Sequence, residues 1–306
     1  MKAYSSALKL VGNTPLVQLN KLKQELNLKS NIFAKIEGFN PGGSAKDRIA
    51  SFIIESYESQ GLLNKDTVFV EATSGNTGIG IAFVCAIKGY KAIIVMPDNM
   101  SKERIQAITS FGAQVILTPA SLGMQGAVEK AEEIKKTDPN AIIFGQFNNP
   151  LNPLAHYYST GPEIWNDTNG NVDIFVAGIG TGGTISGTGK FLKERNNNVQ
   201  IIGVEPESSP LLTKGYAGAH KIQGIGANFV PDTLNKEIID KILTVSDEDA
   251  YYYTNLLAKK EGILAGISSG SALKAAIEIA KQEENKNIVV LFADSGNKYF
   301  STGVFE

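Results

Sequence analysis

The sequence predicts an α/β fold with two open-sheet domains and helices on both faces of each sheet. Apolar runs alternate with helical segments along most of the 306 residues, and these runs are apolar throughout rather than at every second position. Strands of this kind are typical of parallel sheets that are covered on both faces. With 42% hydrophobic residues, the chain can build one large core or two ordinary ones.

The first regular series of elements follows residue 67. The expected order is strand 68–70, helix 76–89, strand 92–96, helix 102–111, strand 114–117, helix 126–136 and strand 141–144. Segment 148–153 then breaks the rhythm with three asparagines and two prolines, so it is the best domain boundary. The second series is expected as strand 172–177, a helix ending at 194, strand 200–204, helices 247–261 and 269–282, and strand 288–292.

The composition excludes several classes of function. The 29 basic and 31 acidic residues nearly cancel, so we expect a small-molecule substrate rather than nucleic acid or an anionic membrane. No apolar run approaches the length of a membrane span and no secretion signal is apparent, which indicates a cytoplasmic protein. Cys85, the only cysteine, lies in an apolar helical stretch and is expected to be inert. With only two histidines besides, no zinc cluster can be assembled and no metal is expected.

Lys46 is the first candidate for chemistry. It lies in segment 40–48 (NPGGSAKDR), directly before a helical pattern that stops at Gly61. Ser44 is the expected N-cap and Asp47 the acid of the first turn, so Lys46 lies where the helix dipole repels an ammonium. A repelled ammonium gives up its proton more readily, which favours a lysine whose neutral amine attacks a carbonyl. A solvated lysine in a loop is the alternative.

A glycine-rich turn, residues 178–184 (GIGTGGT), follows the first strand of the second series. Glycines let the backbone approach an anion, and the N-terminus of the next helix supplies N–H donors, so a phosphate is expected here. Gly178, Gly180 and Gly183, with Glu205 after the next strand, also fit the dinucleotide fingerprint. An NAD-dependent dehydrogenase therefore stays open as an alternative.

Two more strand-to-helix turns are rich in small polar residues. In Glu71–Gly78 (EATSGNTG), a backbone nest suits a carboxylate, and Asn76 can hydrogen-bond another ligand oxygen. An ordinary serine or threonine turn with an N-cap is the alternative. The third turn is Gly266–Gly270 (GISSG). Together with Lys46, these turns are expected to line one anion-binding cleft between the two domains.

These residues resemble a known family, the pyridoxal-phosphate enzymes of the tryptophan-synthase β-like fold (fold type II). Within that family, the chain is most similar to the cysteine synthases (O-acetylserine sulfhydrylases) and to the catalytic cores of cystathionine β-synthases. The likeness covers nearly the whole chain. It is carried by NTPLVQL (13–19), NPGGSAKDR (40–48), EATSGNTGIG (71–80), QFNNPLNP (146–153), TGPEIW (160–165), GTGGT (180–184), VEP (204–206), KIQGIGANF (221–229), GISSG (266–270) and DSGNKY (294–299).

The resemblance implies a role for each site residue. Lys46 forms the internal aldimine with pyridoxal 5'-phosphate, Asn76 hydrogen-bonds the phenolic oxygen of the cofactor, and Ser268 is the partner of its ring nitrogen. The residues expected to bind the cofactor phosphate are Gly180, Thr181, Gly182, Gly183 and Thr184. Those expected to bind the amino-acid substrate are Thr73, Ser74, Gly75, Thr77, Gln146 and Gly224. Residues 42–147 form a smaller, mobile lobe, and residues 1–41 and 148–306 form the larger lobe that binds the phosphate.

The implied reaction is β-replacement at an O-acetylserine- or cysteine-type amino acid through an α-aminoacrylate. Cystathionine β-synthase-type condensation is an alternative. Asp232 departs from the family pattern, because many cysteine synthases have a non-acidic residue there. It is interpreted either as a turn or N-cap residue or as a base that activates water. Water addition would make the protein a cysteine lyase that releases hydrogen sulfide and forms serine.

The resemblance also implies partners. The family suggests a homodimer, and similar cysteine synthases bind the C-terminal tail of serine acetyltransferase in the active-site cleft. A pyridoxal-phosphate protein that serves mainly as a binding partner is therefore the non-catalytic alternative.

Overall fold

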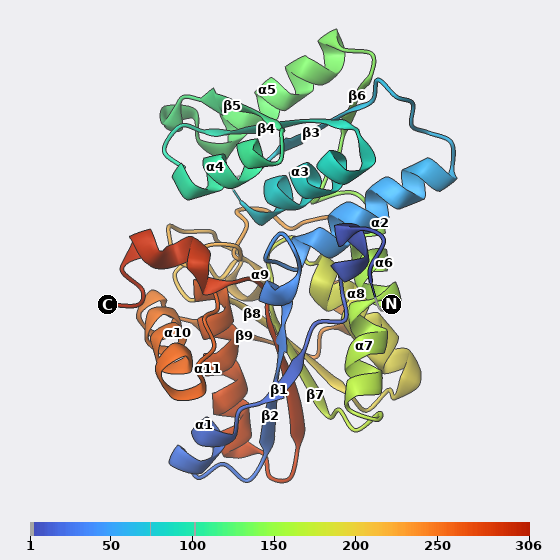
Figure 1. The fold of residues 1–306 in the computed structure, drawn as a ribbon. Helices are drawn as coiled ribbons and strands as arrows, with labels where there is room; N and C mark the ends of the chain where they lie inside the picture. Colours follow the sequence, from blue (N-terminus) through green and yellow to red (C-terminus); the bar gives the residue numbers. More distant parts are fainter. Residues whose placement is uncertain (1–2, 74, 101) are drawn as a thin grey trace. The chain divides into compact units, whose positions relative to one another are not determined.

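The computed structural model describes residues 3–73, 75–100 and 102–306. The chain forms two compact units (Figure 1). Unit 1 comprises Met1–Val11 and Asn40–Leu151, and unit 2 comprises Gly12–Phe39 and Asn152–Glu306. The mobility expected of residues 42–147 stays a prediction. In the described ranges, no helix is both long enough and apolar enough to cross a membrane.

Unit 1 is built on a four-stranded parallel sheet with the order β5-β4-β3-β6. Its main elements are α2 (Lys46–Ser59), β3 (Val68–Ala72), α3 (Asn76–Lys88), β4 (Lys91–Pro97), α4 (Lys102–Ser110), β5 (Gln114–Thr118), α5 (Gly123–Thr137) and β6 (Ala141–Ile143), with 3₁₀ turns η1 (Ala7–Leu10) and η3 (Ala120–Leu122). Val68 and Val70 pack with Ala127 and Ala131 of α5 on one face of the sheet. Helices α3 and α4 cover the other face (Figure 1).

Unit 2 is built on a six-stranded sheet with the order β1-β2-β10-β7-β8-β9. Its strands are β1 (Leu16–Gln18), β2 (Asn31–Ile36), β7 (Ile174–Gly178), β8 (Gln200–Pro206), β9 (Lys241–Val245) and β10 (Asn287–Phe292). Its helices are α1 (Asn20–Glu25), α6 (Leu151–Tyr158), α7 (Thr160–Asp167), α8 (Gly183–Arg195), α9 (Leu211–Lys214), α10 (Asp247–Glu261) and α11 (Ile267–Gln282), with 3₁₀ turns η2 (Glu37–Phe39), η4 (Lys236–Ile238) and η5 (Gly296–Thr302).

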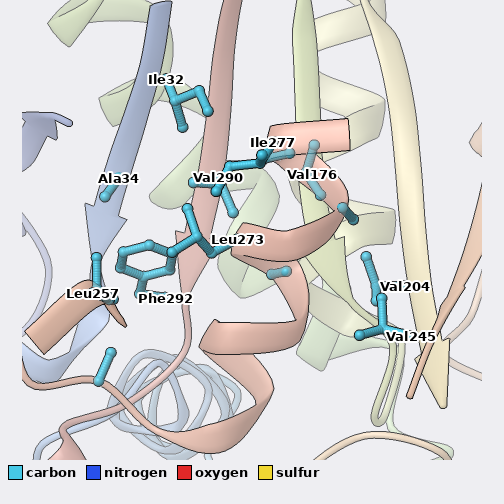
Figure 2. Close-up of a cluster of buried hydrophobic side chains, with 14 of the residues drawn as sticks. Ile32, Ala34, Val176, Val204, Val245, Leu257, Leu273, Ile277, Val290 and Phe292 are labelled. Atoms are coloured by element: carbon cyan, nitrogen blue, oxygen red, sulfur yellow. The ribbon is translucent and has the colours of Figure 1, made fainter. Parts of the chain in front are cut away.

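The core of unit 2 explains why residues 288–292 of its strand β10 are apolar at successive positions. Val290 and Phe292 of β10 pack with Leu273 of α11 on one face of the sheet (Figure 2). Because alternate residues of a strand face opposite sides, Val289 and Leu291 enter a second cluster with α7 and α8 on the other face. Both faces are buried, so the predicted α/β class with helices on both faces is confirmed.

Several short elements of unit 2 were not predicted. Strand β1 pairs antiparallel with β2, Leu16 opposite Lys35, and so departs from the parallel pattern. Strand β9 extends the sheet beside β8. Helix α6 begins inside the asparagine- and proline-rich segment 148–153, and α7 follows it, where no element was expected. Three to eight residues are too few to show a clear hydrophobic period.

Candidate active site

Lys46 is the first residue of α2. The N-cap is Ala45 rather than the predicted Ser44, and it makes no side-chain cap bond. The Ser44 hydroxyl nevertheless accepts the backbone N–H of Lys46 at 3.2 Å. The Asp47 carboxylate accepts the backbone N–H of Gly42 at 2.5 Å and so holds the preceding loop against the helix. The local sequence thus fixes the backbone from which the half-buried Lys46 side chain emerges.

Helix α3 packs against the start of helix α2, where Lys46 lies. A Cβ on Gly80 would lie 3.0 Å from the Lys46 carbonyl oxygen, so glycine permits this close approach. Asn76 is the first residue of α3, about one turn before Gly80. The structure therefore brings Lys46 and Asn76 to neighbouring positions on two packed helices.

The expected carboxylate-binding residues form two hydrogen-bonded pairs in unit 1. The Thr77 hydroxyl donates to Gln146 Oε1 at 2.6 Å, and the Gly75 N–H donates to the Thr73 hydroxyl at 3.3 Å. In the described part of the chain, no atom lies within 4 Å of a Cβ built on Gly75, so this turn borders open space. Ser74 lies outside the described residues.

Glu71, the last acid before this turn, was not assigned a role by sequence reasoning. Its side chain is buried, and its carboxylate accepts the backbone N–H groups of Gly145 at 2.8 Å and Gln146 at 3.3 Å. Burial raises the pKa of Glu71 from its ordinary value of 4.5 to about 7, although the donors from Gly145 and Gln146 oppose that shift. The signal in the sequence that could have revealed Glu71 is a charged residue inside an otherwise apolar strand.

The glycine-rich turn lies between β7 and α8. Gly182 has φ +83°, and a Cβ there would lie 2.6 Å from Leu234 Cβ, so only glycine fits. Thr181 is held on both sides: its hydroxyl accepts from Asn152 at 3.1 Å and its carbonyl accepts from the Thr233 hydroxyl at 2.5 Å. Within the described residues, the backbone N–H groups of Gly180, Thr181 and Gly182 have no protein acceptor.

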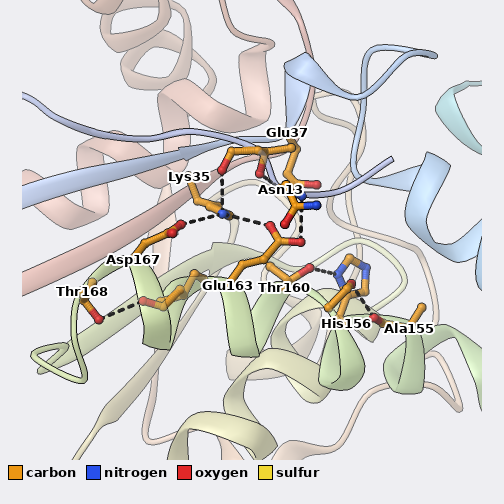
Figure 3. A network of polar contacts seen from close by, with 12 residues as sticks. Asn13, Lys35, Glu37, Ala155, His156, Thr160, Glu163, Asp167 and Thr168 are labelled. Atoms are coloured by element: carbon orange, nitrogen blue, oxygen red, sulfur yellow. Dashed lines mark hydrogen bonds and ion pairs between the residues drawn. The ribbon is translucent and has the colours of Figure 1, made fainter. Parts of the chain in front are cut away.

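A buried polar network supports the last residue of this turn. His156 Nε2 lies 3.1 Å from the Thr184 hydroxyl. Its Nδ1 lies 2.9 Å from the Thr160 hydroxyl (Figure 3). Thr160 begins α7, which is tied to β2 because the fully buried Lys35 ammonium pairs with Glu163 at 2.9 Å. Sequence reasoning did not assign this support, although His156 is one of only two histidines.

Gly224 and Ser268 lie beside the glycine-rich turn. A Cβ on Gly180 would overlap the Gly224 carbonyl oxygen, and a Cβ on Gly224 would lie 3.8 Å from Ser268 Oγ. Gly224 has φ +95°, which favours glycine. Ser268 is buried in the first turn of α11. Three separate segments of unit 2 therefore meet at the expected cofactor residues.

The two acids singled out in unit 2 have different surroundings. Buried Glu205 accepts the Leu212 N–H at 2.9 Å and the Thr213 N–H at 3.1 Å, so it stabilises the backbone after β8 rather than offering itself to a ribose. Asp232 is exposed in a turn, and within the described chain its carboxylate accepts no hydrogen bond. It follows Pro231, which lines a pocket together with Gly180.

The chain belongs to the family of pyridoxal-phosphate dependent enzymes, whose model matches residues 7–294. It is an enzyme of the cysteine synthase type. It is 50% identical to cysteine synthase B of Campylobacter jejuni over 305 residues, which is 100% of both chains. It resembles the crystal structure of a hydrogen sulfide-producing enzyme from Fusobacterium nucleatum with 50% identity, a TM-score of 0.93 and coverage of 97% of this chain and 100% of that chain. For cysteine synthase from Entamoeba histolytica the identity is 39%, the TM-score 0.96 and the coverage 99% and 91%.

The glycine-rich turn fits the phosphate of this cofactor. A phosphate is an acceptor-only anion, and N–H groups at a helix N-terminus that lack protein acceptors are suitable donors. The hydroxyls of Thr181 and Thr184 add side-chain donors that the protein already holds in place. The dehydrogenase alternative is not favoured, because Glu205 is engaged by backbone N–H groups.

Proposed function

We propose that the chain catalyses β-replacement at an O-acetylserine- or cysteine-type amino acid with pyridoxal 5'-phosphate as cofactor. The observation that carries the proposal is a lysine at the first position of α2, packed against the helix that Asn76 begins. The full-length similarity to C. jejuni cysteine synthase B supports the same reaction class.

In this proposal, residues 180–184 bind the cofactor phosphate, Asn76 and Ser268 orient the ring, and Lys46 attaches the cofactor. Pyridoxal phosphate supplies an electrophilic carbonyl and an electron-withdrawing ring. A serine hydroxyl at the ring nitrogen does not hold that nitrogen protonated, as a carboxylate does. A cofactor held by Ser268 would therefore supply a weaker electron sink than one held by a carboxylate.

The remaining steps belong to residues of the chain. The residues proposed to bind the substrate carboxylate are Thr73, Ser74, Gly75, Thr77 and Gln146, with Gly224 as a further substrate-binding residue. Lys46 Nζ removes the proton from the substrate Cα and returns it after the new nucleophile has bonded to Cβ. Fixed donors around the carboxylate hold the Cα–H bond toward that amine, which is a proximity effect.

The Lys46→Ala variant tests this assignment. Wild-type protein is expected to be yellow and to convert O-acetylserine plus sulfide to cysteine, whereas Lys46→Ala is expected to lose at least 10³-fold in rate because both proton transfers need the amine. Lys190→Ala is the matched control, since this α8 lysine has a side chain that is 57% exposed. A colourless wild-type protein that binds NAD would overturn the proposal.

A second reaction is proposed for Asp232, in which the carboxylate activates water and cysteine is converted to serine and hydrogen sulfide. The observation that favours this reaction is that Asp232 is exposed and directly follows Pro231, which lines a pocket. With cysteine as substrate, Asp232→Asn is expected to lower serine output by about 10²-fold while sulfide release with an added thiol acceptor persists. Undiminished serine output from Asp232→Asn would refute the role of this base.

We further infer a cytoplasmic homodimer that binds the C-terminal tail of serine acetyltransferase. Support comes from the resemblance to cysteine synthases. Sedimentation of the purified protein tests the dimer. Competition between the acetyltransferase tail peptide and O-acetylserine tests the partner, because a tail that occupies the substrate site must raise the apparent KM.

A further inference from the structure

Glu71 lies at the point where β3 leads into the substrate-binding turn. Its carboxylate receives three hydrogen bonds from the segment after β6: the Gly145 N–H at 2.8 Å, the Gln146 N–H at 3.3 Å and the Gln146 side-chain amide. Gln146 in turn accepts the Thr77 hydroxyl at 2.6 Å. Glu71 is therefore linked through one side chain to two of the residues assigned to the substrate carboxylate.

The charge of Glu71 determines which way the Gln146 amide faces. An ionised carboxylate only accepts hydrogen bonds, so the Gln146 nitrogen must face Glu71 and its oxygen must face the Thr77 hydroxyl. An amide nitrogen carries two N–H groups, so the second can donate to a substrate carboxylate. A protonated Glu71 can itself donate, and the amide orientation is then no longer imposed.

We propose that ionised Glu71 is a positioning residue that holds Gln146 ready for the substrate carboxylate, so that substrate affinity falls when Glu71 takes up a proton. The inference rests on the proposed function, because that proposal assigns Gln146 and Thr77 to the carboxylate. Glu71 acts through Gln146 and does not itself touch the substrate.

The surroundings of Glu71 make this proton exchange accessible near neutral pH. Burial raises its pKa to about 7, and only hydrogen bonds from Gly145 and Gln146 oppose the shift. No charged group contributes to the raised pKa of Glu71. The charged residues of the elements packed on β3 are Lys88 of α3, Lys91 of β4, and Glu129, Lys130, Glu132, Glu133, Lys135 and Lys136 of α5.

The first test follows the Gly145 and Gln146 backbone amides by NMR while wild-type holoenzyme is titrated from pH 5.5 to 8.5. Both amide resonances are expected to move with one shared midpoint near the Glu71 pKa, because both N–H groups donate to the same carboxylate. In Glu71→Gln they are expected to stay constant. Amides that do not titrate in wild-type protein overturn the proposal, and this holds even if the variant fails to fold.

The second test measures binding of L-alanine, which carries the carboxylate but no β-leaving group, through the absorbance of the holoenzyme. For wild type, the dissociation constant of L-alanine is expected to be on the order of ten-fold higher at pH 6 than at pH 8. The pH dependence measured with L-alaninamide, which lacks the carboxylate, is used to correct this ratio. Glu71→Gln is expected to bind L-alanine weakly, with no such pH dependence. Tighter binding by wild type at low pH would show that repulsion between the two carboxylates dominates, and would overturn the proposal.

Glu37→Gln is the matched control for neutralising a buried glutamate. Glu37 is fully buried in unit 2 and accepts the Thr14 hydroxyl at 2.7 Å. This variant is expected to keep the wild-type pH dependence. The results also distinguish a failure of this inference from a failure of the proposed function. If catalysis depends on Lys46 but the pH dependence of L-alanine binding in Glu71→Gln equals that of wild type, only the Glu71 inference is overturned. Titrating amides in a protein that lacks β-replacement overturn the proposed function instead.

Discussion

At the scale of single residues, burial has opposite consequences for two groups of unit 1. Burial raises the pKa of the Cys85 thiol to about 12, far above neutral pH, so the reactive thiolate is nearly absent. Burial raises the pKa of Glu71 to about 7, which brings a carboxyl group to the point where it exchanges its proton. The starting values differ, so the same desolvation makes one group inert and the other titratable.

Neutralising Glu71 is predicted to change the pH dependence of stability. The folded-state pKa is raised from 4.5 to about 7, so the protonated acid is favoured by folding and its stabilisation is lost as pH rises through this window. This rise in the pKa of Glu71 corresponds to about 3 kcal/mol. Urea unfolding should therefore show wild type losing about 3 kcal/mol relative to Glu71→Gln between pH 4.5 and 7.5. A constant difference between the two proteins would contradict this prediction.

At the scale of elements, glycines decide how closely the site segments approach each other. Gly182 and Gly89 both adopt the left-handed conformation, with φ +83° and +80°. A Cβ on Gly182 would lie 2.6 Å from Leu234 Cβ, whereas a Cβ on Gly89 would meet no described atom within 4 Å. Both positions therefore require the left-handed backbone conformation, but only Gly182 is closely packed against other residues.

Gly182→Ala is predicted to weaken cofactor binding, and Gly89→Ala is the matched control. Each substitution should cost about 1 kcal/mol for the left-handed conformation, measured by denaturant unfolding. Gly182→Ala must also displace Leu234 or the turn, so its cofactor dissociation constant is expected to rise at least ten-fold by absorbance titration. An equal dissociation constant in both variants would show that the turn does not bind the phosphate.

At the scale of the whole molecule, each unit has its own sheet and its own core. The chain also carries one intrinsic probe in each unit. Cys85, the only cysteine, is buried in α3 of unit 1, and Trp165, the only tryptophan, lies in α7 of unit 2. Thiol labelling and tryptophan fluorescence can therefore follow the two units separately.

The proposed cofactor residues belong to both units, so cofactor binding is predicted to couple their unfolding. In holoenzyme, Cys85 labelling and Trp165 fluorescence should show one denaturant midpoint, because ligand binding favours the native state of both units. After cofactor removal, Cys85 should become labelled at a lower denaturant concentration, since two domains need not unfold together. Coincident midpoints in the cofactor-free protein would contradict the prediction.

The sequence predicted the long, regular elements and missed the short ones. Strand β10 is apolar at every position from 288 to 292, which is a local signal of a sheet buried on both faces. Strand β1 has three residues, and its pairing with β2 depends on a neighbour that periodicity cannot reveal. Motifs such as GTGGT indicated a phosphate site because turn chemistry is local, whereas the contacts of Asn152 and His156 with that turn join distant segments.

The sequence by itself determined the α/β class, the family and the lysine at a helix start, because hydrophobic period, glycine placement and helix capping act over a few residues. Only the tertiary structure decided what the acids do: Glu205 binds backbone N–H groups, Asp232 is exposed, and Glu71 is buried beneath the Gly145–Gln146 turn. The physical reason is that the solvation of a carboxylate, and therefore its charge, depends on atoms that folding brings from distant parts of the chain.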